Sequence, residues 1–135
     1  MTGARILLVD DEPAILGVLG RALARAGYQV DTASQADSAY AILGERAVDL
    51  VLLDLRLGQI RGDVLALAVL RRWPRLRGRI VLMSGDPDAS DGWPPELRAC
   101  PVLAKPFPLD LLYRTIAATL HACEAPAQVR ATGAA

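Results

Sequence analysis

The stretch Asp49-Leu50-Val51-Leu52-Leu53-Asp54-Leu55-Arg56 decides how the rest of the chain is interpreted. Its centre, Leu50 to Leu53, is a short continuous apolar run, which is typical of a parallel strand covered on both faces. The run ends in a carboxylate, Asp54. In an open α/β sheet, groups at the carboxyl ends of the strands line the ligand crevice. A charged side chain there is unsuited to packing, so Asp54 is predicted to be the reactive residue.

A second stretch, Arg5-Ile6-Leu7-Leu8-Val9-Asp10-Asp11, repeats the pattern of four apolar residues followed by carboxylates. If the two strands are parallel neighbours, Asp10, Asp11 and Asp54 meet at one sheet edge. Three carboxylates that close together repel one another and need a cation or shared protons. Mg²⁺ suits a site with few carboxylates because it keeps several of its waters. The residues alone leave open that Asp10 or Asp11 only caps the following helix.

The remaining chain alternates apolar runs with helical patterns, which predicts an α/β fold with a parallel sheet and right-handed crossovers. Strands are expected near residues 6–9, 28–32, 50–53, 80–83 and 102–104, and helices over 13–26, 36–43 and 62–72 and from Pro108 onwards. The segment from Asp86 to Cys100 contains several prolines, which do not fit a helix interior. At most one or two helical turns, such as Pro94 to Ala99, are expected there.

Bulk properties narrow the possible functions. The 135 residues suffice for one domain, and the formal net charge of zero gives no indication of a nucleic-acid or anionic-membrane partner. The apolar runs are too short to cross a bilayer or to act as a signal peptide. Cys100 and Cys123 lack metal-ligand spacing and are expected to be free thiols in the cytoplasm. Residues 1–123 are expected to form the domain, with 124–135 as a flexible tail.

Polar groups also follow the later strands. Ser84 ends the fourth predicted strand, and Lys105 follows the fifth. Either residue alone is most simply a turn or surface residue. Together with Asp10, Asp11 and Asp54, however, they line one crevice, because the carboxyl ends of parallel strands share a sheet edge. Three acids, a hydroxyl and an ammonium group there indicate that a metal and a phosphoryl group are handled together.

From Arg5 to about His121, the chain resembles the receiver domain of two-component response regulators. The matching motifs are Leu7-Leu8-Val9-Asp10-Asp11-Glu12-Pro13, Leu52-Leu53-Asp54-Leu55 with Gly62, Met83-Ser84-Gly85 and Lys105-Pro106-Phe107. The resemblance implies a flavodoxin-like, doubly wound five-stranded parallel sheet of strand order 2-1-3-4-5.

The resemblance also implies a role for each site residue. Asp54 is the phosphoacceptor, Ser84 the switch hydroxyl, and Lys105 the partner of the phosphoryl group. Mg²⁺ is held by Asp11, Asp54 and the backbone carbonyl of Arg56, with Asp10 acting through water. The Lys105–Pro106 bond is expected to be cis.

Function and partners follow from the same resemblance. The phosphoryl group comes from a phosphohistidine on a sensor histidine kinase or a histidine phosphotransfer protein, and the modified domain changes its contacts with a downstream protein. No direct contact with nucleic acid or membrane is expected. The domain is cytoplasmic and is no enzyme, apart from catalysing its own phosphorylation and dephosphorylation. Met1 and the ragged end favour a stand-alone receiver.

Three features depart from the family pattern. The helix between strands 4 and 5 is expected to be short or irregular, as in receivers attached to hybrid sensor kinases. Val102 stands three residues before Lys105, where the family usually has an aromatic residue that moves with the switch hydroxyl. Gly58 replaces a common proline, which predicts a freer loop after Asp54.

Two other interpretations remain possible. A phosphorylation-independent pseudo-receiver would bind partners without accepting a phosphoryl group, although every pocket residue is present. A Mg²⁺-dependent phosphatase with an aspartate nucleophile usually has a second acid two residues after the nucleophile. That place is occupied by Arg56, and the chain has no spare length for a substrate cap.

Overall fold

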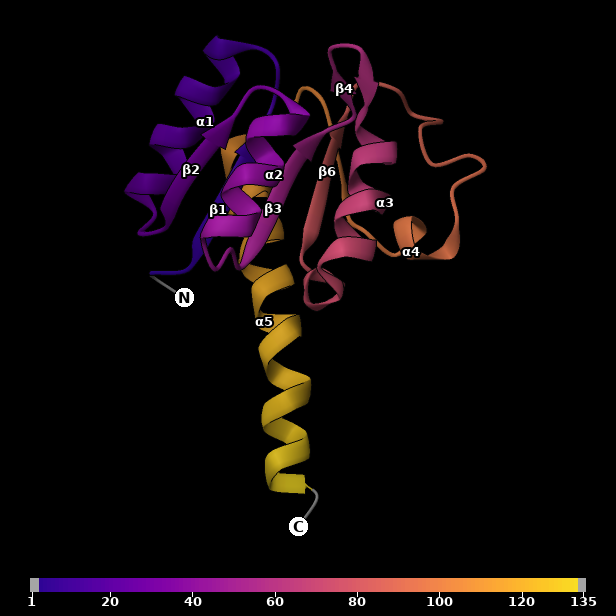
Figure 1. Ribbon diagram of the computed structural model, residues 1–135. Helices are drawn as coiled ribbons and strands as arrows, with labels where there is room; N and C mark the ends of the chain where they lie inside the picture. The colour runs from indigo at the N-terminus through magenta and orange to yellow at the C-terminus, as the bar shows by residue number, and fades with distance from the viewer. Residues whose placement is uncertain (1–2, 134–135) are drawn as a thin grey trace.

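The fold is a parallel sheet with helices on both faces, seen in the computed structural model of Figure 1, which describes residues 3–133 and the side chains as far as Cys123. Five strands form the sheet in the order β2-β1-β3-β6-β7, all parallel, which confirms the predicted 2-1-3-4-5 order. The strands are β1 (Arg5–Val9), β2 (Gln29–Ala33), β3 (Leu50–Asp54), β6 (Ile80–Ser84) and β7 (Val102–Ala104).

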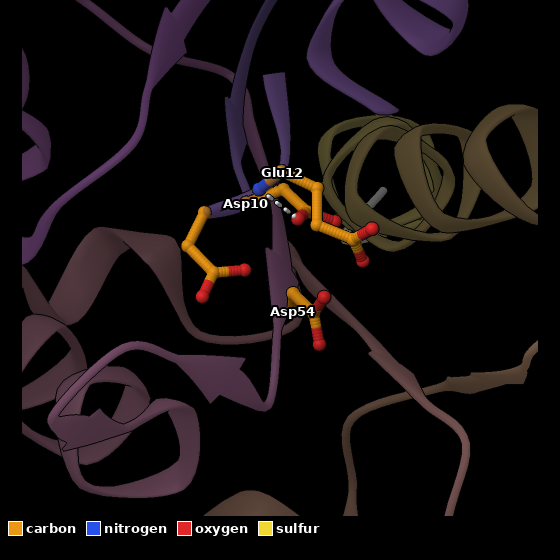
Figure 2. Close-up of side chains that lie close together, drawn as sticks. Asp10, Glu12 and Asp54 are labelled. Atoms are coloured by element: carbon orange, nitrogen blue, oxygen red, sulfur yellow. Dashed lines mark hydrogen bonds between the residues drawn. The ribbon is translucent and has the colours of Figure 1, made fainter. Parts of the chain in front are cut away.

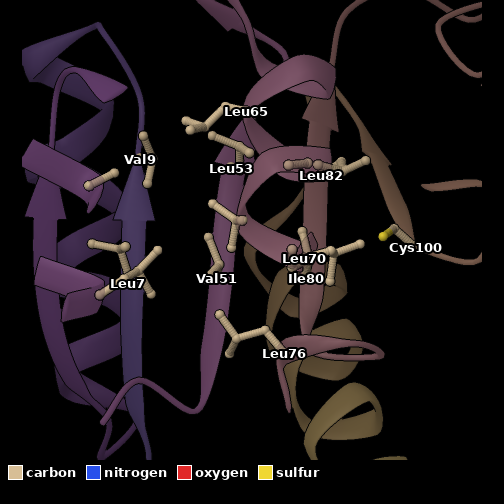
Figure 3. Packing of buried hydrophobic residues seen from close by; sticks show 14 of the residues in the cluster. Leu7, Val9, Val51, Leu53, Leu65, Leu70, Leu76, Ile80, Leu82 and Cys100 are labelled. Carbon is tan, nitrogen blue, oxygen red and sulfur yellow. The ribbon is translucent and has the colours of Figure 1, made fainter. Parts of the chain in front are cut away.

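The helices divide between the two faces because successive strand residues point in opposite directions. On one face, Leu7, Val51 and Leu53 belong to the apolar cluster that includes buried residues of α2 (Ala36–Glu45), α3 (Gly62–Arg72) and α4 (Pro95–Arg98), part of which Figure 3 shows. On the other face, Leu50 and Leu52 pack with buried residues of α1 (Pro13–Arg25) and α5 (Leu109–Gly133). A short 3-10 helix, η1 (Pro74–Leu76), follows α3.

The strand register brings the predicted site residues together. Val9 of β1 lies beside Leu53 of β3, so the residues that follow them, Asp10 and Asp54, are neighbours. Ser84, the last residue of β6, lies beside Ala104, which directly precedes Lys105. The sequence prediction that these four residues share one sheet edge is therefore confirmed.

The loop after Asp54 is a tight hairpin rather than the freer loop predicted from Gly58. Arg56–Leu57 (β4) pairs antiparallel with Ile60–Arg61 (β5), and residues 58 and 59 form the turn. Gly58 has φ +63° at the first turn position, where a type II′ turn takes glycine. The glycine supplies a backbone conformation that this turn requires, and the pairing on both sides removes the expected freedom.

The region between β6 and β7 contains only α4, which confirms the expected short helix. The final helix is longer than predicted, because the backbone of α5 is helical to Gly133 and its far end projects beyond the sheet in Figure 1. Residues 134–135 of the expected tail lie outside the described residues, and the domain boundary at residue 123 stays a prediction. Among the described residues, no helix is both long and apolar enough to span a membrane.

Candidate functional site

The candidate site lies where β1 and β3 end, and its centre is the buried carboxylate of Asp54. Figure 2 shows Asp10, Glu12 and Asp54 grouped beyond these strand ends. Asp10 and Asp54 are 0% and 3% exposed. Burying two carboxylates side by side is unfavourable unless a cation accompanies them. The site is therefore built to hold positive charge.

Lys105 supplies part of that charge. Its Nζ lies 2.6 Å from Asp54 Oδ2 and 3.3 Å from Asp10 Oδ2. Burial alone would lower the pKa of Lys105, but the hydrogen bond and negative charge of Asp54, together with the charge of Asp10, raise this pKa overall. The ammonium group consequently stays protonated and bridges the two carboxylates.

Asp10 also shapes the loop that follows β1. The Glu12 backbone N–H donates a hydrogen bond to Asp10 Oδ1 at 2.9 Å, while Glu12 itself is the N-cap residue of α1. Burial raises the pKa of Asp10 to about 6, and the adjacent Asp54 contributes to this rise, partly offset by the Glu12 N–H and Lys105. The alternative that Asp10 or Asp11 only caps the helix is therefore wrong, because Glu12 is the N-cap residue and no side chain caps α1. Asp10 instead orders the turn before the helix and belongs to the acidic cluster.

Asp11 and Glu12 complete the cluster from the exposed side. Each of Asp10, Asp11, Glu12 and Asp54 places one carboxylate oxygen within 4.8 Å of the others. A set made only of oxygen donors suits a hard divalent cation such as Mg²⁺. Glu12 is absent from the ligand set predicted from the sequence, although three consecutive acids directly after a strand are a signal that includes it.

The geometry of the hairpin supports the backbone carbonyl oxygen of Arg56 as a further candidate metal ligand. The Gly62 N–H donates to the Leu55 carbonyl at 2.9 Å, which marks Leu55 and Gly62 as a hydrogen-bonded position, although the Leu55 N–H bonds to the Met83 carbonyl. Bonded and non-bonded pairs alternate in an antiparallel ladder, so the peptide groups of Arg56 point away from Arg61. Accordingly, the Arg56 N–H donates to Asp54 Oδ1 at 2.9 Å. The Arg56 carbonyl lies on the same side of the strand as this N–H.

Ser84 is buried at the end of β6, but its hydroxyl bonds within its own loop. Ser84 Oγ donates to the Asp86 carbonyl at 3.3 Å and accepts the Asp86 N–H at 2.9 Å. Beside it is a cavity of about 430 Å³ whose lining includes Ser84, Ala89 and Trp93. Among the described residues, no hydrogen bond joins the Ser84 hydroxyl to Asp54 or Lys105; the one bond between Ser84 and Lys105 runs from the Lys105 backbone N–H to the Ser84 carbonyl at 2.8 Å. The sequence places Ser84 at the correct edge without revealing this orientation.

The raised pKa of Asp10 gives a stability prediction. The ordinary value is 3.8 and the folded value about 6, so between these pH values the folded state binds more protons than the unfolded chain. Stability should therefore fall as the pH rises through this window, and full destabilisation is reached above about pH 6. Asp10→Asn, which keeps an acceptor for the Glu12 N–H, should stabilise the protein at pH 7.5 in chelator by about 1–3 kcal/mol.

Urea unfolding of both proteins between pH 4 and pH 8 measures this effect. The difference in the free energy of unfolding between the two proteins should shrink towards pH 4. At pH 7.5, millimolar Mg²⁺ should also reduce this difference, because it stabilises the wild type selectively. A difference that is independent of pH would show that Asp10 carries no unfavourable charge in the folded protein.

Comparison with known proteins agrees with this geometry. Residues 6–117 match the family model of the response regulator receiver domain. The chain is 34% identical to the transcriptional regulatory protein GlrR of Escherichia coli over 84% of this chain and 25% of GlrR. It is 35% identical to the transcriptional regulatory protein KdpE of Mycobacterium tuberculosis over 92% of this chain and 54% of KdpE. It therefore spans only a quarter to about half of these relatives.

The fold is also found among solved structures. The response regulator protein TrrA of Thermotoga maritima, in complex with Mg²⁺-BeF, superimposes with a TM-score of 0.75 at 29% identity, over 86% of this chain and 98% of TrrA. Sequence and structure thus give the same assignment as the strand-end residues. The chain belongs to the response regulator receiver domain family of two-component signalling proteins.

Proposed function

We propose that Asp54 is the phosphoacceptor of this receiver domain and takes its phosphoryl group from the phosphohistidine of a sensor histidine kinase or a histidine phosphotransfer protein. The observation that supports this most strongly is the buried Asp54 carboxylate, 2.6 Å from the Lys105 ammonium and within the acidic cluster. Two-component systems pair response regulators with sensor kinases, and membership of the receiver domain family supports the role of phosphoacceptor for this chain.

In the proposed transfer, an oxygen of Asp54 forms a bond to phosphorus while the phosphorus–nitrogen bond of the donor breaks. The electron pair remains on the imidazole nitrogen, which then takes a proton, and an acyl phosphate is left on Asp54. Lys105 lies where it can neutralise charge on the phosphoryl oxygens, so positioning and electrostatic stabilisation provide most of the rate enhancement. Bound Mg²⁺ would add the positive charge that offsets repulsion between the carboxylates and the phosphoryl group.

Asp11, Asp54 and the Arg56 carbonyl would hold Mg²⁺ directly, with Asp10 acting through water. The all-oxygen cluster and the direction of the Arg56 peptide group support this set. TrrA, which has the same fold, was solved with Mg²⁺-BeF. The position of the Glu12 carboxylate within the cluster adds it as a candidate for a water-mediated contact.

Ser84 is the proposed switch hydroxyl. To reach a phosphoryl group on Asp54, its Oγ must give up the hydrogen bond that it donates to the Asp86 carbonyl. Breaking this bond frees the following loop, whose residues 86–94 contain no helix or strand. Val102 is 41% exposed and is no large aromatic, so phosphorylation should move chiefly the segment from Ser84 to Cys100.

Trp93 reports this movement, because it is 7% exposed and lines the cavity beside Ser84. In a Trp73→Phe background, Trp93 is the one tryptophan left of the two in the chain. We expect its fluorescence emission to shift to longer wavelength on phosphorylation, as the loop moves and water reaches the ring. The same protein carrying Asp54→Asn is the control and should show no shift. Full phosphorylation by mass with unchanged emission would place the movement elsewhere.

The output of this switch is a change in contacts with a downstream protein. The net charge of zero still suggests that the domain itself does not bind nucleic acid. That expectation does not extend to a whole regulator, since GlrR and KdpE are transcriptional regulatory proteins. The domain is a signalling module, and we propose that its only catalysis is its own phosphorylation and dephosphorylation, in the cytoplasm.

Incubation with a small phosphodonor and Mg²⁺, followed by intact mass measurement, tests the proposal. A receiver should gain the mass of one phosphoryl group, which is lost again at alkaline pH as expected for an acyl phosphate. A pseudo-receiver should gain none. A phosphatase should release phosphate from added monoesters continuously without lasting modification.

A further inference from the structure

Two arginines lie directly opposite each other in the hairpin beside the phosphoacceptor. Arg56 of β4 is paired with Arg61 of β5. The hydrogen bond from Gly62 to Leu55 makes this a non-hydrogen-bonded pair, the type in which facing side chains approach most closely. Like charges in directly opposed positions destabilise an antiparallel pair. The sequence therefore places an unfavourable pair at the edge of the reactive site.

Neighbouring groups neutralise only one member of this pair. Asp63, at the start of α3, accepts two hydrogen bonds from Arg61, at 3.1 Å to Nε and 2.5 Å to the terminal nitrogen. No described carboxylate lies within ion-pair distance of the Arg56 guanidinium. The fork geometry of the Asp63 contact restricts Arg61 and leaves one positive charge without a partner.

Both arginines line the cavity that contains the phosphoacceptor. This cavity, of about 600 Å³, is lined by three acids (Asp11, Glu12 and Asp54) and three cations (Arg56, Arg61 and Lys105), so its lining charges balance at −3 and +3. Without the two arginines the lining charges would sum to −2, which would repel a phosphoryl dianion. The buried carboxylate of Asp10 behind the cluster would add to that repulsion. Because Asp63 already pairs with Arg61, Arg56 supplies the positive charge of the hairpin that has no ion-pair partner.

We propose that Arg56 and Arg61 form an anion-binding site at the opening of this cavity, which binds the phosphoryl group of the donor before transfer to Asp54. Guanidinium groups recognise phosphate through paired N–H donors, and two of them on one hairpin face offer more donors than Lys105 alone. A bound dianion also removes the repulsion between the paired arginines. The inference rests on the proposed function of Asp54 and adds the residues that receive the donor.

Arginine side-chain NMR tests the site apart from transfer. In Asp54→Asn protein without metal, inorganic phosphate should shift the Nε–Hε signals of Arg56 and Arg61 along a saturable curve, while Arg75 on η1 should not shift. Because Asp54 is absent, this result does not depend on phosphorylation. Equal, non-saturating shifts of all three arginines would show only screening by salt and would overturn the proposal.

Phosphorylation kinetics test whether the arginines speed the transfer of the phosphoryl group to Asp54. With a small acyl phosphate and Mg²⁺ at low salt, Arg61→Gln should lower the second-order rate constant about three- to tenfold, and Arg61→Lys should recover part of the loss. The deficit should disappear at about 1 M salt, where charges are screened within a few ångströms. Arg75→Gln, an equal charge change remote from the site, is the matched control and should react as the wild type.

Comparing the small acyl phosphate with a phosphohistidine protein as phosphodonor shows which part of the donor Arg61 recognises. A deficit of similar size with a phosphohistidine protein supports recognition of the phosphoryl group itself. A deficit with the protein donor alone would mean that Arg61 contacts the donor surface, and the proposal would be wrong. If wild-type protein takes no phosphate at all, the function proposed for Asp54 fails, whereas the NMR titration still decides whether the anion site exists.

Discussion

Asp54→Asn should abolish phosphodonor labelling and leave the fold intact. Asparagine keeps the size of the side chain and an oxygen that can accept the Arg56 N–H, now 2.9 Å from Asp54 Oδ1. It lacks the negatively charged oxygen needed to form the bond to phosphorus. It also removes one charge from the cluster, which relieves repulsion. The expected result is complete loss of the added phosphoryl mass, with unfolding as cooperative as that of the wild type.

A matched exchange separates this effect from a general loss of charge. Asp37, in the first turn of α2, is exposed and outside the acidic cluster, so Asp37→Asn should label at the wild-type rate. Equal labelling of Asp54→Asn and wild type would identify another residue as the acceptor. It would also remove the basis for assigning roles to Ser84 and Lys105.

Gly62→Ala should be among the most destabilising single substitutions in the domain. A Cβ atom on Gly62 would overlap the Asp54 carbonyl oxygen and would lie 2.5 Å from Leu55 Cα. Both are backbone atoms, so no flexible side chain can move aside, and the strand end or the helix start must shift. We expect a loss of at least about 2–3 kcal/mol in urea unfolding, as for severe overpacking. The same shift would displace Asp54 and slow its phosphorylation.

Gly44→Ala is the control for this substitution. Gly44 is near the end of α2 and needs no positive φ, and a Cβ atom added to it would meet no atom within 4 Å beyond its local backbone. Alanine should stabilise that helix by up to about 1 kcal/mol, because it has the higher helix propensity. If Gly62→Ala were as stable as Gly44→Ala, the close approach of α3 to the end of β3 would be incorrect.

The sheet and the main site residues are predictable from the sequence because their signals are local. Continuous apolar runs mark buried parallel strands, and a charged residue that ends such a run lies at the sheet edge for reasons of topology alone. Asp10, Asp54 and Lys105 are therefore placed correctly without knowledge of side-chain orientation. The cis Lys105–Pro106 bond, expected from the family resemblance, is also confirmed.

Three features that the sequence did not predict give no recognisable residue pattern: a very short strand pairing, a contact between distant segments and the direction of a hydroxyl group. The hairpin of β4 and β5 depends on pairing over two residues per strand, which is too short to give a pattern of alternation. Asp11 Oδ2 accepts the Gly58 N–H at 3.2 Å across 47 positions of the chain. The direction of the Ser84 hydroxyl depends on its hydrogen bonds to the Asp86 backbone in the same loop, and no residue pattern in the sequence predicts it.

The bridging position of Lys105 changes how the signal should be understood. Its ammonium group already bonds Asp54 and Asp10 before any phosphoryl group arrives. Phosphorylation therefore exchanges one set of charge-assisted hydrogen bonds for another. The energy that remains to rearrange the Ser84 loop is the difference between two large and similar quantities. Small changes around Lys105 should consequently alter the fraction of molecules in the active conformation more than they alter the chemistry at Asp54.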